Sequence, residues 1–279
     1  MDNSVITPEI KQKLLTVAFD QMKQRNKHLL FCSVSGSHIW GLSRPDSDFD
    51  LRGVYSDSPQ DFLGFRSSTD TIEFKVEPDI DGQFYELEKF LRLLCAGNGN
   101  MVTQALSPIS LYPQYKTADD YYREGIEYQF QYLATKAITK QLKNYYKGYA
   151  QSQRKRAMSE RGSKALIYTY REIFSGLHVM RYGKMEFDFK ALLAEATMNG
   201  WYPTGLLDQY YPSCLGKHVT IDNEKWQQFW IEWEKLDQKL EEEAAKSTLP
   251  EKAEGLREEC EQLLMEYRFF LVKGLGSIL

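Results

Sequence analysis

The sequence has few cysteines and few histidines, which limits the metal and redox chemistry that it can support. Its 279 residues include 4 cysteines and 4 histidines, and neither set has the spacing of a zinc site or of a catalytic triad. The cysteines are Cys32, Cys95, Cys214 and Cys260. We therefore expect them to be reduced thiols, as is typical of the cytosol.

Long apolar runs are also missing. No stretch approaches the roughly 20 apolar residues that span a bilayer, and the polar start Met1-Asp2-Asn3-Ser4 lacks the apolar core of a signal peptide. The net charge of −4, from 35 basic and 39 acidic residues, gives no general attraction to nucleic acid or membrane. We expect a cytoplasmic globular protein, long enough for two domains and without internal repeats.

One stretch near the N-terminus combines a turn with paired carboxylates. The apolar run from His28 to Val34 predicts a buried strand that ends in a tight turn at Gly36 and Ser37, where backbone N–H groups can approach a phosphate. Asp48 and Asp50 follow at the start of a second predicted strand, on which alternate side chains share a face. Two neighbouring carboxylates repel unless a cation lies between them, and Mg²⁺ prefers oxygen ligands. The stretch predicts a site for a phosphate and a divalent cation.

Longer motifs extend this pattern. They are Gly36-Ser37-x-x-Trp40-Gly41, then Pro45-Asp46-Ser47-Asp48-x-Asp50-x-Arg52-Gly53-Val54-Tyr55, then Tyr85-Glu86-Leu87-x-Lys89-Phe90-Leu91. Together they resemble the RNA-ligase-associated branch of the DNA polymerase β-like nucleotidyltransferase superfamily. The resemblance implies a nucleotidyltransferase fold, Mg²⁺ or Mn²⁺ as the metal, and a nucleoside triphosphate, ATP above all, as substrate. In this pattern Gly36 and Ser37 bind the β- and γ-phosphates.

The superfamily site also has a third carboxylate on an adjacent strand. We assign it to Asp81, four residues before Tyr85, with catalytic and metal-binding roles shared with Asp48 and Asp50. Asp79 is an alternative, because Ile80 between the two would let both face one side of an extended segment. Either residue could instead cap a helix that the apolar spacing predicts over 84–95.

The second half of the chain has helical periodicity throughout. We expect an α+β protein, with a mixed sheet and flanking helices at residues 1–112 and an all-α domain at residues 113–279 that closes over the nucleotide. Two prolines, Pro108 and Pro113, mark the boundary. The predicted helices cover 120–132, 136–156, 160–182, 189–198, 223–246 and 250–271.

Charge is unevenly distributed in this half. The region between Lys143 and Lys190 is basic, whereas Glu241 to Glu243 begin a strongly acidic segment that we expect to be a solvated helix face. Within the basic region, Lys143, Lys164, Tyr168 and Arg171 lie in blocks that resemble the helical domain of the same family, which implies that they bind the nucleotide. Lys143 and Lys164 are expected to contact the β- and γ-phosphates, and Arg171 to orient a phosphate or an acidic group of the first domain. The same cations could instead form salt bridges between domains.

The resemblance implies nucleotidyl transfer: an acceptor hydroxyl attacks the α-phosphorus, AMP is transferred, and pyrophosphate leaves. Asp81 is the expected general base. RNA is the expected acceptor. A protein hydroxyl, a small molecule, or a catalytically silent nucleotide sensor are alternatives that residue patterns alone leave open.

Overall fold

The computed structural model describes residues 6–65, 69–76, 78–111, 118–202, 205–211 and 221–276. The chain forms two compact units. The sheet unit comprises Asp2–Ile39, Ser47–Ala137 and Ala253–Leu279, and the helical unit comprises Trp40–Asp46 and Ile138–Lys252. The predicted boundary between residues 112 and 113 lies outside the described residues, so the domains 1–112 and 113–279 stay a prediction.

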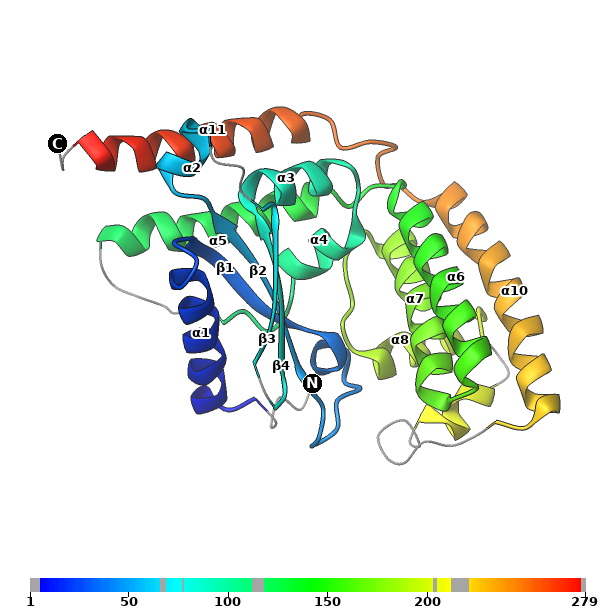
Figure 1. Ribbon diagram of the computed structural model, residues 1–279. Coiled ribbons are helices and arrows are strands. Elements are labelled where there is room, and N and C mark those ends of the chain that lie inside the picture. Colours follow the sequence, from blue (N-terminus) through cyan, green and yellow to red (C-terminus); the bar gives the residue numbers. More distant parts are fainter. Residues whose placement is uncertain are drawn as a thin grey trace. The chain divides into compact units, whose positions relative to one another are not determined.

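The sheet unit is built on a mixed sheet, which confirms the predicted α+β class (Figure 1). Its strands are β1 (His28–Ser35), β2 (Phe49–Ser56), β3 (Thr71–Val76) and β4 (Ile80–Glu86), in the order β1-β2-β4-β3. The β1–β2 and β3–β4 pairs are antiparallel, whereas β2 and β4 are parallel. The outer edge of β1 is covered by the segment after α4, because the Ile109 carbonyl accepts from the Val34 amide at 2.9 Å.

The helix predicted over 84–95 is wrong in its first three residues, which belong to strand β4. The helix itself, α3, spans Leu87–Cys95. Phe84 is fully buried and its ring meets the Phe74 ring of β3 at 5.3 Å, so tertiary packing outweighs the local helical pattern. Glu86 then caps the helix by accepting a hydrogen bond from the Glu88 amide at 2.6 Å.

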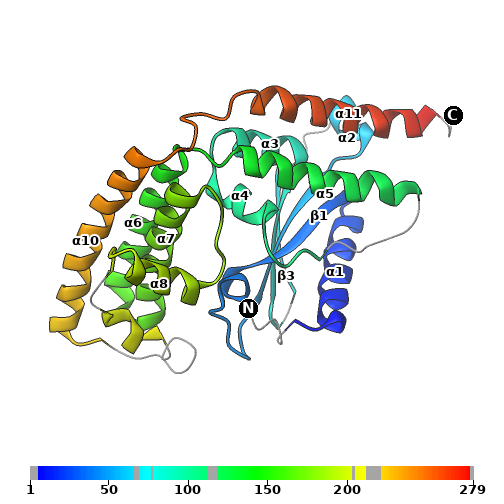
Figure 2. The ribbon, with the colours of Figure 1, turned by 180° about the vertical axis from the view of Figure 1, so that it is seen from behind.

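Helices flank this sheet within the same unit. They are α1 (Pro8–Lys23), η1 (Gly36–Trp40), α2 (Pro59–Leu63), α3, α4 (Gly99–Ala105), α5 (Ala118–Lys136) and α11 (Leu256–Gly276), except that the last residue of η1, Trp40, belongs to the helical unit. Helix α1 begins with Thr7 accepting from the Ile10 amide at 3.3 Å and Pro8 in the first turn. Helix α11 packs against α3 and α5, although more than a hundred residues of the helical unit precede it in sequence (Figures 1 and 2).

The helical unit contains α6 (Leu142–Glu160), α7 (Ser163–Tyr182), α8 (Phe189–Met198), η2 (Leu206–Gln209) and α10 (Asn223–Lys246). Helices α8 and α10 have the predicted bounds. Helix α6 starts later than the predicted residue 136, after a turn in which the Leu142 amide donates to the Thr139 carbonyl at 3.1 Å. Across the part of the chain that the structure describes, no helix is long and apolar enough to cross a bilayer.

Candidate active site

The predicted phosphate-binding turn lies directly after β1. Gly36 has a φ of 65°, a conformation that costs other residues about 1–2 kcal/mol. A Cβ atom at this position would also overlap the carboxylate of Asp50, so only glycine leaves that side chain where it is. The register of β1 and β2 explains the closeness, since Ser35 pairs with Asp50. The turn and one predicted metal ligand are therefore immediate neighbours.

The three predicted carboxylates lie at the same end of the parallel strand pair. Asp50 on β2 lies opposite Asp81 on β4 in the strand register, and Asp48 lies two residues before Asp50. Aligned residues of neighbouring strands project to the same face of a sheet. Asp79 lies just before β4, where its carbonyl oxygen accepts from the Phe49 amide at 2.7 Å. The register therefore favours Asp81 over Asp79 as the partner of Asp50.

Among the residues that the structure describes, only long, partly exposed ion pairs neutralise the charges of Asp50 and Asp81. An Arg52 nitrogen lies 3.5 Å from Asp50 Oδ1, and Lys75 Nζ lies 3.7 Å from Asp81 Oδ1. Both pairs are partly exposed, and such pairs contribute little stability. Asp81 Oδ1 and Asp79 Oδ1 are nevertheless buried without a hydrogen-bond donor. A buried carboxylate oxygen without a donor is costly and suits a cation or an ordered water.

These donors fit a hard divalent cation by their chemistry, because carboxylate oxygens are the ligands that Mg²⁺ and Mn²⁺ take. They do not form a closed cage. Over the described residues, no three His, Cys, Asp or Glu side chains converge closely enough to hold a metal ion. The site thus offers an aligned pair, Asp50 and Asp81, with Asp48 exposed beside it.

A histidine of the predicted phosphate-binding turn, His38, lies close to the acids. The His38 ring stacks on the Phe49 ring at 4.6 Å with an angle of 6°. Burial lowers the pKa of His38, against the opposing influence of the Ser47 and Asp48 backbone and the Asp50 charge, so the ring is neutral at pH 7. Its Nε2 atom is buried without a hydrogen-bond partner. His38 and Phe49 are eleven positions apart with no repeating pattern, so only the fold brings them together.

The predicted nucleotide-binding residues of the helical unit have different surroundings. Lys164 is exposed at the start of α7, with no ion pair to any described residue. Lys143 forms an ion pair with Glu241 at 2.6 Å. Arg171 is buried, where its guanidinium lies 4.0 Å from the centre of the Trp40 ring and 5.5 Å from that of Tyr168.

An acidic side chain also contacts Arg171. Arg171 forms an ion pair with the buried Glu172, and burial lowers its pKa without removing its positive charge at neutral pH. Trp40 belongs to the first motif, so Arg171 anchors the part of that motif that lies in the helical unit. A role in holding Trp40 accounts for its burial, whereas its predicted phosphate contact stays a prediction.

The acidic segment of α10 is partly solvated, as expected, since Glu241 and Glu242 are exposed, but the helix also makes ion pairs with its neighbours. Its carboxylates pair with cations of α6 and α7, namely Lys143–Glu241, Lys147–Asp237, Lys147–Glu241, Arg154–Glu234 and Arg181–Glu243. Helices of opposite charge therefore pack against each other inside the helical unit, and much of the predicted basic face is neutralised there.

Comparison with known proteins identifies a matching family and two similar proteins. The sequence profile of RlaP, the RNA repair pathway DNA polymerase beta family, matches residues 10–266. The chain is also similar to Uncharacterized protein MJ0002 of Methanocaldococcus jannaschii, with 30% identity over 167 residues, 58% of this chain and 64% of that protein. It is 26% identical over 177 residues to Uncharacterized protein YcgL of Bacillus subtilis, covering 60% of this chain and 62% of that one. Both matches span just under two thirds of the relative's length.

Proposed function

The chain belongs to the RNA repair pathway DNA polymerase beta family, and from this premise we propose that it is a divalent-metal-dependent nucleotidyltransferase. It transfers a nucleoside monophosphate, AMP from ATP, to the hydroxyl of an RNA acceptor. The main support is the register that sets Asp50 opposite Asp81, with Gly36 packed against the Asp50 carboxylate. This places two acids beside a turn with backbone donors, as phosphoryl transfer requires.

Asp48, Asp50 and Asp81 are the proposed ligands of Mg²⁺ or Mn²⁺. When bound, the cation lowers the pKa of the acceptor hydroxyl and offsets negative charge on the triphosphate. The buried Asp81 Oδ1 atom, which lacks a donor, gives Asp81 a free acceptor site and makes it the proposed general base. The turn contributes the backbone N–H of Gly36 and the hydroxyl of Ser37 as donors to the outer phosphates.

The bond changes follow from these roles. Asp81 accepts the proton of the acceptor hydroxyl, and the hydroxyl oxygen attacks the α-phosphorus. The bond between that phosphorus and the bridging oxygen breaks, and pyrophosphate leaves. His38 is neutral and stacked on Phe49, so its contribution is to keep the backbone before Asp50 in place.

Incubation of the protein with α-³²P-ATP, Mg²⁺ and RNA that carries a free 3′ hydroxyl tests the proposal. We expect labelled RNA and released pyrophosphate. Asp50→Asn and Asp81→Asn should each lower the rate at least about 100-fold. Asp46→Asn is a matched control, because Asp46 lies four residues from Asp50 but is exposed and paired with Arg44 at 3.0 Å.

Several results would contradict parts of the proposal. Wild-type rates in Asp50→Asn and Asp81→Asn would show that neither acid takes part in the reaction. In a cell lysate, label that survives nuclease but not protease would indicate a protein acceptor, and label that resists both would indicate a small molecule. ATP binding without pyrophosphate release would indicate a nucleotide sensor.

A further inference from the structure

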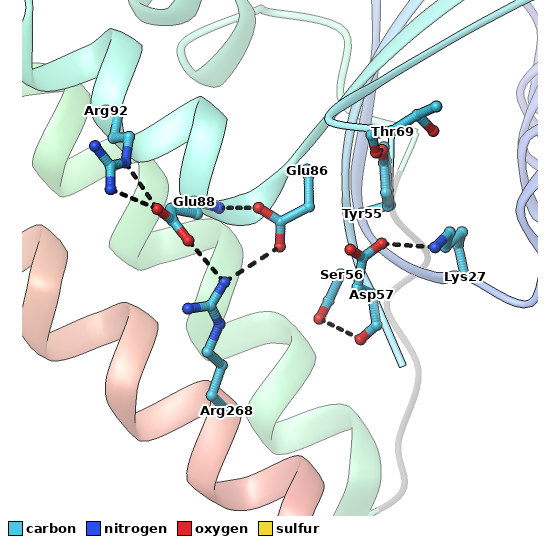
Figure 3. Close-up of polar contacts among 9 residues, drawn as sticks. All are labelled: Lys27, Tyr55, Ser56, Asp57, Thr69, Glu86, Glu88, Arg92 and Arg268. Atoms are coloured by element: carbon cyan, nitrogen blue, oxygen red, sulfur yellow. Dashed lines mark hydrogen bonds and ion pairs between the residues drawn. The ribbon is translucent and has the colours of Figure 1, made fainter. Parts of the chain in front are cut away.

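The C-terminal helix α11 is held against α3 by a cluster of charges in the sheet unit. An Arg268 nitrogen of α11 lies 2.9 Å from Glu88 Oε2 and 4.0 Å from Glu86 Oε1, and Glu88 also pairs with Arg92 at 2.6 Å. Figure 3 shows the Arg268 side chain reaching toward both carboxylates. Glu88 is therefore shared between its own helix and α11, and this fixes the register of the two helices.

The same register brings two cysteines together about two turns away. Cys95 lies seven residues after Glu88 on α3, and Cys260 lies eight residues before Arg268 on α11. Spacings of seven and eight return to the same face of a helix, so two antiparallel helices joined at Glu88 and Arg268 also meet at these cysteines. Cys95 and Cys260 line the same pocket between these helices, and both are free cysteines.

A pocket gives small molecules access to the pair. It has a volume of about 430 Å³ and lies between the two helices of the sheet unit. Its lining includes Cys95 and Cys260, the apolar Leu91 and Leu264, and the cationic Arg257. Cys95 is half-buried, whereas Cys260 is only 3% exposed. The pocket wall therefore presents one accessible sulfur with a second sulfur behind it.

The two thiols differ in acidity. The neighbouring Cys260 thiol lowers the pKa of Cys95, and the charge of Arg257 adds to this shift, whereas burial and the charges of Glu261 and Glu258 oppose it. The neighbouring Cys95 thiol, together with burial, raises the pKa of Cys260. Cys32 differs from both, because it is fully buried in β1 and burial alone raises its pKa. Among the cysteines that the structure describes, Cys95 is thus the better nucleophile, and Cys32 is an internal example of an inert thiol.

We propose that Cys95 and Cys260 form a redox-active pair that peroxides oxidise to a disulfide joining α3 to α11. The Cys95 thiolate attacks one oxygen of hydrogen peroxide, the O–O bond breaks, and the departing hydroxide takes a proton from solvent to become water. The Cys260 sulfur then attacks the resulting sulfenic acid. The S–S bond forms, the S–O bond breaks, and the second hydroxide leaves as water with the Cys260 proton. In sum, the two thiols lose two electrons and two protons, and one peroxide becomes two waters.

This site is separate from the proposed transferase site, since Cys95 and Cys260 lie on helices α3 and α11, whereas Asp50 and Asp81 lie on strands β2 and β4. Its consequence is structural: the bond ties the C-terminal helix to the helix that follows β4. Because the two cysteines are 165 positions apart in sequence, the cross-link also restricts the unfolded chain. The oxidised protein should therefore unfold at a higher temperature than the reduced protein.

The test uses the full chain with Cys214→Ser, because Cys214 lies outside the described residues. Native protein is treated with hydrogen peroxide, remaining thiols are alkylated, and a non-reducing peptide map is read by mass spectrometry. We expect two thiols to disappear together, one cross-link between the Cys95 and Cys260 peptides, an unmodified Cys32, and full reversal by dithiothreitol. In Cys95→Ser, oxidation of Cys260 should slow at least about tenfold. In Cys260→Ser, Cys95 should be trapped by dimedone as a sulfenic acid.

The peptide map of the protein that keeps both Cys95 and Cys260 shows whether the disulfide forms, even if a variant folds poorly. A cross-link to Cys32, a cross-link between two molecules, or independent loss of the two thiols would overturn the proposal. Equal rates of Cys260 oxidation with and without Cys95 would overturn the assigned order of attack.

Discussion

Replacing Gly36 with alanine should destabilise the protein more than the same replacement at Gly41, although both glycines have a φ of 65°. The conformational cost is common to both and amounts to about 1–2 kcal/mol. The surroundings differ. A Cβ atom at Gly41 would meet nothing closer than Asp188 Oδ1 at 3.7 Å, an ordinary contact, whereas at Gly36 it would overlap the Asp50 carboxylate.

Asp50 must therefore move in the Gly36→Ala variant. Turning its side chain out of a favourable rotamer costs about 0.5–1.5 kcal/mol beyond the cost of φ. The expected loss is about 1.5–3.5 kcal/mol for Gly36→Ala and about 1–2 kcal/mol for Gly41→Ala. A difference of about 1 kcal/mol should separate the two melting temperatures by roughly 2–4 °C.

Differential scanning calorimetry of the two variants measures this difference. Titration with Mg²⁺ in the presence of ATP supplies a second readout, because a displaced Asp50 should weaken metal binding in Gly36→Ala and leave Gly41→Ala unchanged. Equal melting temperatures for the two variants would refute the contact between Gly36 and Asp50. Equal Mg²⁺ affinities would show instead that Asp50 is not a ligand.

Further predictions concern the helical unit. Lys164→Ala should weaken ATP binding more than AMP binding, because its proposed partners are the outer phosphates. Calorimetric titration with both nucleotides measures the two affinities. Equal losses of affinity would show that Lys164 does not contact the outer phosphates. Glu241→Gln should lower the melting temperature at pH 6, and this effect should shrink progressively as the pH falls below about 4. Its ion pairs with Lys143 and Lys147 lower the pKa of Glu241, so this stabilisation exists above the unfolded pKa and disappears as pH falls through the folded one. An effect of Glu241→Gln that does not change with pH would exclude these pairs as its cause.

Local patterns were sufficient for much of the fold. The apolar run of β1 and the periodicity of α8 and α10 each depend on neighbouring residues, and all were predicted from the sequence. Strand β4 was missed because Phe84 follows a polar, glycine-containing segment and begins a helical apolar pattern. Its strand conformation depends on Phe74, ten positions away on another strand.

In the candidate site, too, features within one sequence motif were predicted, whereas those that depend on distant residues were not. Gly36, Asp48 and Asp50 were identified because they lie close together in one motif. The alignment of Asp50 with Asp81 requires β2 and β4 to be parallel neighbours, which no spacing in the sequence reveals. Side-chain pairs such as Lys143 with Glu241, 98 positions apart, are equally inaccessible to patterns, because several basic residues could satisfy each acid.

The surroundings of the predicted cations also decide which of them can bind a phosphate. Lys143 and Glu241 have side chains that are 26% and 44% exposed, so their ion pair contributes at most about 1 kcal/mol. Breaking it to bind a nucleotide would lower affinity by less than about tenfold, which leaves Lys143 available. Removing Arg171 from its buried partner Glu172 would leave an unpaired buried charge, at a cost of about 3–5 kcal/mol and more than 100-fold in affinity. Lys143 and the exposed Lys164 are therefore the candidates for phosphate contacts, whereas Arg171 acts by fixing Trp40.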